Sequence, residues 1–398
     1  MSQTPGPRVA GSMYSTRAIV DLAAIRHNLA QARSLADGRA VLLALKANAY
    51  GHGAVEVARM VTRTGCADWL GVATVPEGVE LREAGVGLPI LKLSHCFRDE
   101  VMTALEHDIS VAVVDEASID AAQAAGARLG GEHPVQLKVD TGMRRIGVEP
   151  AGAAALAARI VASPNLSLQG IFTHLPVSDM GGDDDQAFTR TELERFRATV
   201  DAVTTAVGPV NLVHATPSGG LLQHDLAGMT MVRPGILAYG YFPDASTARP
   251  VDLKRAMSLV SRVSFVKKVP AGESVGYGRT WTATEDSWVA TVPVGYADGY
   301  SRLNSNRGRM LVRGRSYPIV GRVCMDQTMI NLGPGTPEVR VGDEVVLMGR
   351  SGDEVVDADE LAAQMGTISY EVTCLIAPRV TRTYLDEDWR GAGSANWY

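Results

Sequence analysis

The stretch AVLLALKANAYGHG, residues 40–53, predicts a strand, a tight loop and a helix in succession. Its apolar run, residues 41–45, has the length of a buried strand, and two glycines open a turn before an amphipathic segment at residues 54–61. Lys46 directly follows the strand. An amine that is desolvated at such a place can have its pKa lowered enough to form an imine with an aldehyde near neutral pH. Taken alone, a lysine after a strand is more often a solvated surface group, so its neighbours decide between the two interpretations.

Short apolar runs alternate with alanine-rich helical stretches from about Ala18 to Tyr241, which is the rhythm of repeated βα units. The runs lie at residues 18–22, 41–45, 88–93, 109–114, 135–139 and 168–173, and residues 210–215 and 230–235 are further strand-like pieces. No GxGxxG motif follows a strand, which disfavours an open dinucleotide-binding sheet. The sequence therefore predicts a TIM (β/α)8 barrel in the N-terminal part of the chain.

After Tyr241 the pattern changes to that of a mostly β domain. Segments such as SWVATVPV, residues 287–294, alternate or run apolar over strand lengths, and glycine and proline turns separate them. One short helix is expected at DADELAAQMG, where Asp357 or Asp359 could cap it. The proline- and aspartate-containing segment 242–252 is the expected boundary. We expect a tail at residues 1–13, a barrel at 14–245, a β domain at 246–388 and a tail at 389–398.

Composition narrows the classes of partner. The chain has 398 residues and a net charge of −6, and no basic patch is visible that would favour nucleic acid or an anionic membrane. Its four cysteines are widely separated and form no CxxC pair, so the sequence signals neither a metal site nor a disulfide framework. No apolar segment approaches the roughly 20 residues of a membrane span, and the first residues lack the apolar core of a signal peptide. We expect a cytoplasmic protein.

Polar side chains follow the expected barrel strands, and the C-terminal strand ends are where such barrels carry their active sites. These residues are Lys46, Tyr50, Lys138, Arg145, His174, His214, Ser218, Arg233 and Gly235. A single histidine at a loop start is more often a hydrogen-bonded polar group than a functional one, but the joint placement of two weakens that interpretation. The segment VRPGI could present the N–H groups of Gly235 and Ile236 to an anion, with the Ser218 hydroxyl beside them.

Several motifs together resemble the alanine racemases, pyridoxal-phosphate enzymes with a TIM barrel followed by a β domain. KANAYGHG, GYADGY and GRVCMDQ occur in this order, and the resemblance spans nearly the whole chain. It implies that Lys46 binds pyridoxal 5'-phosphate covalently. It also implies that Tyr277, in SVGYGRTW, is the second base and comes from the partner subunit of a homodimer. Racemisation then needs one base on each face of the substrate α-carbon.

The resemblance assigns roles to the other candidates as well. The residues that would hold the cofactor phosphate are Tyr50, Ser218, Gly235 and Ile236. Arg233 would face the pyridine nitrogen, with His214 behind it and His174 between Arg233 and Tyr277. A guanidinium keeps its proton, so the ring is a weaker electron sink and side reactions are limited. Decarboxylases of the same fold place a glutamate at this point, and the absence of an acidic residue in TMVRPGI favours a racemase.

The substrate side of the site is implied in the same way. Arg145 would bind the substrate carboxylate together with the backbone N–H of Met325 of the partner subunit, and Tyr296 would line the access channel. Lys138 matches a lysine that is carbamylated in the family, and the competing interpretation is an ordinary ion pair with Asp140.

The chain departs from the family pattern after ISYEVTC, where a tyrosine is usual and this sequence has Pro378. Loss of the phenol removes one phosphate hydrogen bond and leaves room beside the substrate side chain, so a broader-specificity or serine racemase is a second hypothesis. The motifs are also compatible with a decarboxylase of the same fold, a non-catalytic vitamin-B6 carrier or a cofactor-independent barrel isomerase. The carrier family lacks a β domain, so the residues after 250 disfavour it.

Overall fold

The computed structural model describes residues 14–386, which form two compact units. The first unit comprises residues 24–254, and the second comprises residues 14–23 together with residues 255–386. The tails expected at residues 1–13 and 389–398 lie outside the described residues. No helix within residues 14–386 has the length and apolar character needed to cross a membrane.

The first unit is built on an eight-stranded parallel sheet with the order β8-β7-β6-β5-β4-β3-β2-β9. Its strands are β2 (Ala40–Ala44), β3 (Trp69–Val72), β4 (Ile90–His95), β5 (Ile109–Val113), β6 (His133–Lys138), β7 (Leu166–Phe172), β8 (Leu212–His214) and β9 (Met231–Val232). The first and last strands of this order, β8 and β9, approach each other. Next to them, Thr230 N–H donates to Val213 O and Arg233 N–H donates to Thr216 O, both at 2.9 Å. The sheet is therefore a nearly closed barrel, as predicted.

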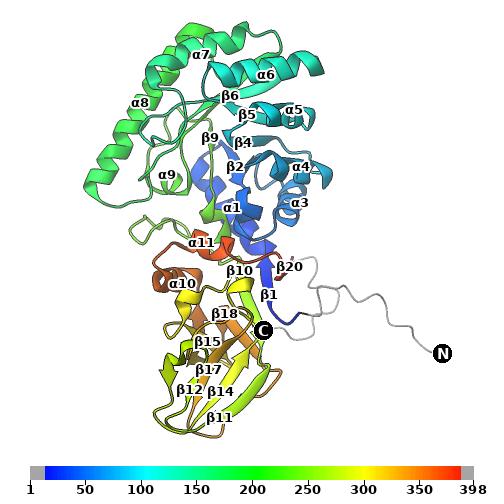
Figure 1. Cartoon of the computed structure of the whole chain (residues 1–398). Helices are drawn as coiled ribbons and strands as arrows, with labels where there is room; N and C mark the ends of the chain where they lie inside the picture. The colour runs from blue at the N-terminus through cyan, green and yellow to red at the C-terminus, as the bar shows by residue number, and fades with distance from the viewer. Residues whose placement is uncertain (1–13, 387–398) are drawn as a thin grey trace, which may run out of the picture. The chain divides into compact units, whose positions relative to one another are not determined.

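Helices and short turns follow the strands, and the longer helices lie on the outer side of the sheet (Figure 1). They are α1 (Leu22–Ala36), α2 (Lys46–Tyr50), α3 (Ala54–Thr64), α4 (Val75–Glu83), α5 (Arg98–Glu106), α6 (Glu116–Leu129), α7 (Pro150–Ala162), α8 (Asp183–Val207), α9 (Ser218–Gln223) and η2 (Ile236–Tyr239). Capping boxes begin two of them: Thr74 with Glu77 at α4, and Asp115 with Ser118 at α6. The barrel core consists of inward and outward apolar side chains of these strands, and Val41, Leu42 and Leu43 are fully buried.

Strand β1 (Arg17–Asp21) differs from the expectation. The sequence places residues 18–22 at the start of the barrel, whereas β1 pairs antiparallel with β10 (Met257–Arg262) and parallel with β20 (Thr381–Leu385) in the second unit. The apolar pattern of residues 18–22 fits a strand of either unit. It does not show which strand is the partner, because that partner lies more than 230 residues away in sequence. The true second barrel strand, β3, has only four residues and was not among the expected runs.

The second unit is mostly β, as predicted. Its largest sheet has seven strands with the order β16-β15-β18-β10-β1-β20, and β19 pairs with β18. A three-stranded sheet β11-β14-β17 and a β12-β13 hairpin complete it. The remaining strands are β11 (Phe265–Val269), β12 (Ser274–Val275), β13 (Trp281–Thr282), β14 (Ser287–Val292), β15 (Arg309–Val312), β16 (Arg315–Pro318), β17 (Thr328–Gly333), β18 (Glu344–Ser351) and β19 (Glu354–Val356).

Short helices connect these strands: η3 (Tyr277–Arg279), η4 (Tyr296–Asp298), η5 (Arg302–Asn304), α10 (Ala358–Met365) and α11 (Ser369–Cys374). Asp357 caps α10 through the Glu360 N–H at 2.9 Å. The second unit resumes at Arg255, later than the expected start at residue 246. The intervening segment packs with the first unit, because Asn28 exchanges two hydrogen bonds of 2.8 Å with the backbone of Lys254.

Candidate active site

Lys46 opens a left-handed turn at the C-terminal end of β2. Residues 47–50 all have φ between 53° and 55°, a region that costs a non-glycine residue roughly 1–2 kcal/mol. Contacts from outside the turn hold it: Ala47 N–H donates to Glu77 Oε1 at 2.7 Å, and Asn48 Oδ1 accepts the Ala54 N–H at 2.7 Å. The turn brings the chain back so that the Tyr50 ring centroid lies 6.0 Å from Lys46 Nζ. The sequence pattern indicates only an ordinary loop here.

Tyr50, Ser218 and Gly235 form a cradle with hydroxyl and backbone groups. Ser218 Oγ accepts the N–H groups of Gly235 at 2.9 Å and Leu237 at 3.3 Å. A Cβ at position 235 would lie 2.6 Å from the Tyr50 hydroxyl oxygen, so glycine permits the close approach of this hydroxyl. The Tyr50 ring packs on Tyr239 with centroids 4.9 Å apart. Hydroxyls and backbone dipoles that are gathered in this way are groups that bind a phosphate.

Arg233 directly follows β9, is buried and is surrounded by acceptors at the ends of β7 and β8. Its Nη1 lies 2.7 Å from His214 Nδ1, and its Nη2 donates to Thr173 O at 2.8 Å and to Ala215 O at 3.1 Å. His174 Nδ1 lies 3.4 Å from the same Nη2. Burial and the charge of Arg145 lower the pKa of Arg233 to about 9, which leaves the guanidinium protonated at neutral pH.

His214 is held as a neutral imidazole. Because its Nδ1 accepts from Arg233, its proton is on Nε2, which donates to Gln136 Oε1 at 2.7 Å. The ring stacks on Phe172 with centroids 4.9 Å apart and an interplanar angle of 1°. Burial and the charge of Arg233 hold the pKa of His214, and likewise that of His174, well below the usual range of histidine.

Lys138 is buried beside the same aromatic ring, with Nζ 4.3 Å from the centroid of Phe172. Burial, then the charges of Arg233 and Arg145, lower the pKa of Lys138 well below its ordinary value. Asp140 directs its carboxylate to the N–H groups of Gly142 and Arg144, both at 3.0 Å. This geometry disfavours the ordinary Lys138–Asp140 ion pair.

Arg145 is exposed in the loop after β6. It lies close enough to Lys138, His174 and Arg233 for its charge to lower all three pKa values. The candidates of the first unit are thus brought together at the ends of its strands. The sequence pattern did not identify Gln136 and Phe172, which contact His214. For Gln136 one indication was present, namely a polar glutamine within the apolar strand segment VQLKV.

The remaining candidates belong to the second unit and are exposed there. Tyr277 begins η3 and has 73% of its side chain exposed, whereas Tyr296 and Met325 have 43% and 53% exposed. Tyr296 and Met325 lie in adjoining segments, because Tyr296 N–H donates to Cys324 O at 3.1 Å and Ala297 N–H donates to Met325 O at 3.0 Å.

Comparison with known proteins covers most of the chain. A family model of the alanine racemase N-terminal domain matches residues 20–243, and one of the alanine racemase C-terminal domain matches residues 256–384. The alanine racemase of Cutibacterium acnes is 50% identical over 372 residues, which make up 94% of this chain and 98% of that protein. The chain belongs to the alanine racemase family. The expected family is thereby confirmed.

Other alanine racemases agree. The one from Symbiobacterium thermophilum is 43% identical over 94% of this chain and 97% of its own length. The solved structure of the alanine racemase of Clostridium difficile 630 has a TM-score of 0.88 at 32% identity, covering 94% of this chain and 97% of that one. The structure from the D-cycloserine producing Streptomyces lavendulae has a TM-score of 0.87 at 32% identity, covering 98% and 100%.

Alanine racemases are isomerases that use pyridoxal 5'-phosphate. The described residues fit this group. The cradle at Gly235 offers the hydroxyls of Tyr50 and Ser218 as donors for a phosphate, and a Cβ at position 235 would displace the Tyr50 hydroxyl. Arg233 offers a buried donor of fixed charge, and Lys46 offers an amine at the end of β2.

Proposed function

We propose that the protein interconverts L-alanine and D-alanine with pyridoxal 5'-phosphate, using Lys46 and Tyr277 of the partner subunit as its two bases. The observation that carries this proposal is the Arg233–His214–Gln136 chain, in which a protonated guanidinium and a neutral imidazole replace the acidic residue of a decarboxylase. Pyridoxal phosphate, when bound, withdraws electrons from the substrate α-carbon and makes its proton acidic.

The barrel residues bind and orient the cofactor. Lys46 would hold it covalently, and the phosphate would be bound by Tyr50, Ser218, Gly235 and Ile236. Arg233 would donate a hydrogen bond to the pyridine nitrogen and keep its own proton, since its pKa of about 9 leaves the guanidinium charged at neutral pH. His214 fixes the orientation of Arg233 at 2.7 Å.

Two side chains move the α-proton. Lys46 Nζ removes or returns it on one face, and the Tyr277 hydroxyl does so on the other face. His174 Nδ1 lies 3.4 Å from Arg233 Nη2, and burial and the charge of Arg233 lower the pKa of His174. With Nδ1 accepting from Arg233, the Nε2–H of His174 is the group that would donate a hydrogen bond to the tyrosine oxygen. Arg145 and the backbone N–H of Met325 of the partner subunit bind the substrate carboxylate.

A proton NMR measurement in deuterated water with chiral analysis tests this function. The cofactor-loaded protein should exchange the α-proton of L-alanine and produce D-alanine. No exchange despite bound cofactor would support a decarboxylase or a carrier instead, and release of carbon dioxide would identify the decarboxylase. Tyr277→Phe should stop exchange on one face and leave cofactor absorbance intact.

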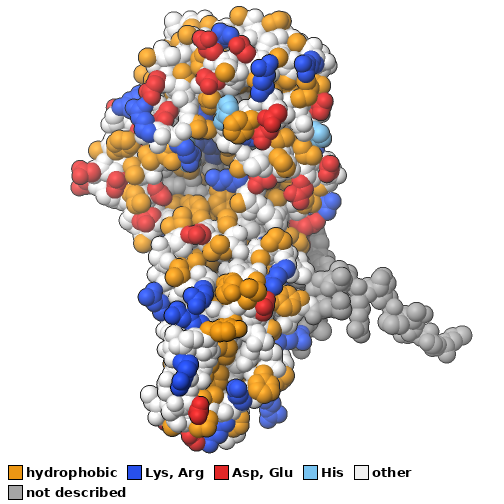
Figure 2. Space-filling model, in the orientation of Figure 1, with side chains coloured by type: hydrophobic (Ala, Val, Ile, Leu, Met, Phe, Trp, Pro, Cys, Tyr) orange, Lys and Arg blue, Asp and Glu red, His pale blue; other side chains and the backbone are white. Residues whose placement is uncertain are grey.

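We propose a homodimer with shared active sites. Of the thirteen exposed large hydrophobic side chains among residues 14–386, eight belong to the smaller second unit, including Tyr277, Tyr296 and Met325. Figure 2 shows hydrophobic side chains gathered on the drawn face of this unit. Exposed apolar surface of this kind marks a protein interface.

Mixing two inactive variants tests the shared site. In a heterodimer of Lys46→Ala with Tyr277→Phe, one site carries both defects and the other carries neither. Activity should therefore return on mixing, to at most half of the wild-type value per dimer. Inactivity of the mixed dimers, isolated with two different tags, would count against the shared site.

A second candidate is a racemase of broader specificity, which Pro378 favours. Pro378 is exposed after α11 and has no hydroxyl to offer a phosphate. Comparing kcat/KM for L-serine and L-alanine tests it, and a ratio below about one in ten thousand would exclude the relaxed pocket.

A further inference from the structure

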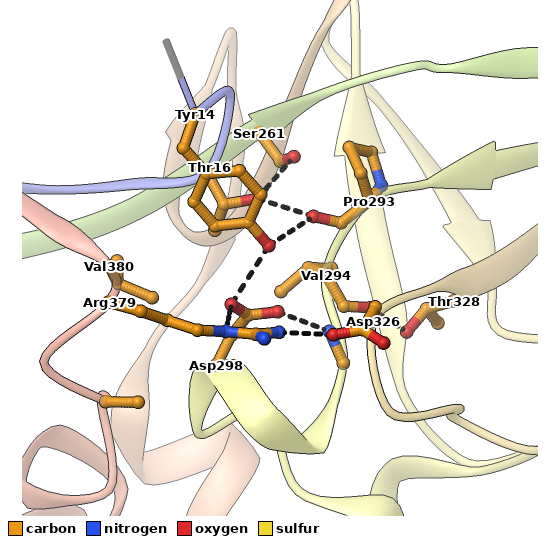
Figure 3. Close-up of polar contacts among 12 residues, drawn as sticks. Tyr14, Thr16, Ser261, Pro293, Val294, Asp298, Asp326, Thr328, Arg379 and Val380 are labelled. Carbon is orange, nitrogen blue, oxygen red and sulfur yellow. Dashed lines mark hydrogen bonds and ion pairs between the residues drawn. The ribbon is translucent and has the colours of Figure 1, made fainter. Parts of the chain in front are cut away.

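Asp298 is a fully buried carboxylate that connects three segments of the second unit (Figure 3). Its Oδ1 accepts the Tyr14 hydroxyl at 3.0 Å and Arg379 Nε at 2.7 Å. Its Oδ2 accepts the Gly295 N–H at 2.9 Å. Each of its partners lies on a different part of the chain, so Asp298 ties together the segment before β1, the η4 turn and the segment after α11.

Arg379 extends the connection to the segment of Met325. Its Nη2 donates to Asp326 Oδ1 at 2.7 Å, while its Nε is bound to Asp298. The guanidinium therefore bridges two carboxylates with two separate nitrogens, and this geometry fixes its plane. Asp326 directly follows Met325.

The backbones of the two segments also meet directly. Tyr296 and Ala297 donate their N–H groups to the carbonyl oxygens of Cys324 and Met325 at 3.1 and 3.0 Å. A Cβ at Gly295 would lie 2.2 Å from Cys324 O, so only glycine permits the approach. Backbone hydrogen bonds thus already align residues 295–298 with residues 324–326, and the side chains of Asp298 and Arg379 add a second connection between these segments.

We propose that Asp298 and Arg379 are positioning residues, which hold Met325 and Tyr296 in the arrangement that receives the substrate carboxylate. The proposal rests on the function proposed above, in which the Met325 N–H binds that carboxylate. Neither Asp298 nor Arg379 touches the substrate. Loss of Arg379 leaves the Asp298 carboxylate buried with one charged partner fewer and frees Asp326, so the residues 324–326 can shift.

Arg309 provides a matched control within the same unit. Its Nε lies 2.8 Å from Glu360 Oε1 and its Nη1 lies 2.7 Å from Glu354 Oε2, so it too bridges two carboxylates. These bonds join β15 to β19 and α10, and neither carboxylate belongs to the segments 295–298 or 324–326. Arg379→Ala and Arg309→Ala therefore remove the same type of interaction at two places.

Two readouts test the proposal. Hydrogen–deuterium exchange of the peptides that contain Tyr296 and Ala297 should be faster in Arg379→Ala than in wild type, and unchanged in Arg309→Ala. In steady-state kinetics, Arg379→Ala should raise KM for alanine about tenfold with kcat changed less than about threefold, and Arg379→Lys should recover part of the loss.

The outcomes separate this proposal from the proposed function. Unchanged exchange at Tyr296 and Ala297, or an equal KM change in Arg379→Ala and Arg309→Ala, overturns the positioning role. If wild type exchanges no α-proton of alanine, the proposed function fails and the substrate part of this inference fails with it. The exchange measurement still shows in that case whether Arg379 orders the segment, because it needs no catalysis.

Discussion

Nδ1 of His214 accepts a hydrogen bond of 2.7 Å from Arg233, and this single contact fixes the protonation of both residues. The imidazole must carry its proton on Nε2, and the guanidinium must keep its charge. The acceptor for Nε2 is Gln136, a residue at the middle of β6. The orientation of the charged Arg233 guanidinium at the strand ends therefore depends, through His214, on Gln136 inside the barrel.

Replacing Gln136 by methionine should leave the His214 Nε2–H without its acceptor. We expect a loss of about 1–3 kcal/mol of stability and a fall in kcat of about tenfold. Gln169→Met is the control, because Gln169 accepts from Gln136 and Ser110. Thermal unfolding and steady-state kinetics of both variants measure the effect, and an equal loss of kcat in the control would contradict the role of Gln136.

Lys138 should react with carbon dioxide. Burial and the charges of Arg233 and Arg145 lower the pKa of Lys138, which favours the uncharged form of Nζ. In that form Nζ attacks the carbon of carbon dioxide, releases one proton and becomes an anionic carbamate. A carbamate resonance should appear in 13C NMR with labelled bicarbonate and disappear in Lys138→Arg. Lys138→Ala should raise KM for alanine about tenfold, because the anion beside Arg145 is lost.

Lys92 serves as the control for this measurement. It is equally buried, but its Nζ donates to Ser94 Oγ at 3.3 Å and lies 3.9 Å from Glu100 Oε2. Lys92→Arg should keep the resonance. Persistence of the signal in Lys138→Arg would exclude Lys138 as its source.

Glu192 on α8 should make stability depend on pH. Its side chain is buried. Burial raises its pKa from 4.5 to about 7. The folded state therefore holds the proton more tightly than the unfolded state, so stability falls as the pH rises from about 4.5 through 7.

Glu192→Gln should remove this loss. We expect the variant to gain about 1–3 kcal/mol relative to wild type at pH 8 and little at pH 5. Urea unfolding at the two pH values measures the difference. Glu194→Gln changes an exposed neighbour on the same helix and should show no such dependence; a gain in Glu192→Gln that is equal at both pH values would refute the explanation.

A glycine substitution in the left-handed turn after Lys46 should not reduce the stability of the protein, whereas a glycine substitution in a helix should reduce it. Ala47 has a φ of 53°, and Ala47→Gly removes the Cβ that disfavours this region. We expect stability to be unchanged or raised by up to about 1 kcal/mol, because the greater freedom of the unfolded chain offsets part of the gain. Ala30→Gly, at an exposed position of α1, should instead cost about 1 kcal/mol. Chemical denaturation compares the two, and equal losses would disprove the strain.

Sequence periodicity predicted the barrel because its strands are buried on both faces and read as continuous apolar runs. It also predicted which residues gather at the site, since strand ends in such a barrel share one face. It could not predict the left-handed turn, because Glu77 holds Ala47 from another βα unit. Nor could it assign β1 to the second unit, because the alternation of apolar residues within a strand does not show which strand it pairs with.

The roles of individual side chains required geometry. Lys138 and Asp140 are two residues apart and read as an ion pair, yet Asp140 binds backbone N–H groups instead. Phe172 reads as an ordinary core residue, although it packs against both His214 and Lys138. The network of Asp298 and Arg379 joins residues 81 positions apart, which no local pattern indicates.

Because β1 pairs with β10 and β20, the sheet of the second unit can be completed only after the barrel strands have been synthesised. On the ribosome β1 is made before β10 and β20, so the sheet that the three strands share can be completed only after residue 385 has been synthesised. The barrel strands are all present long before that point. A fragment that starts at residue 256 would lack the strand between β10 and β20, and both would expose a bare hydrogen-bonding edge to other chains.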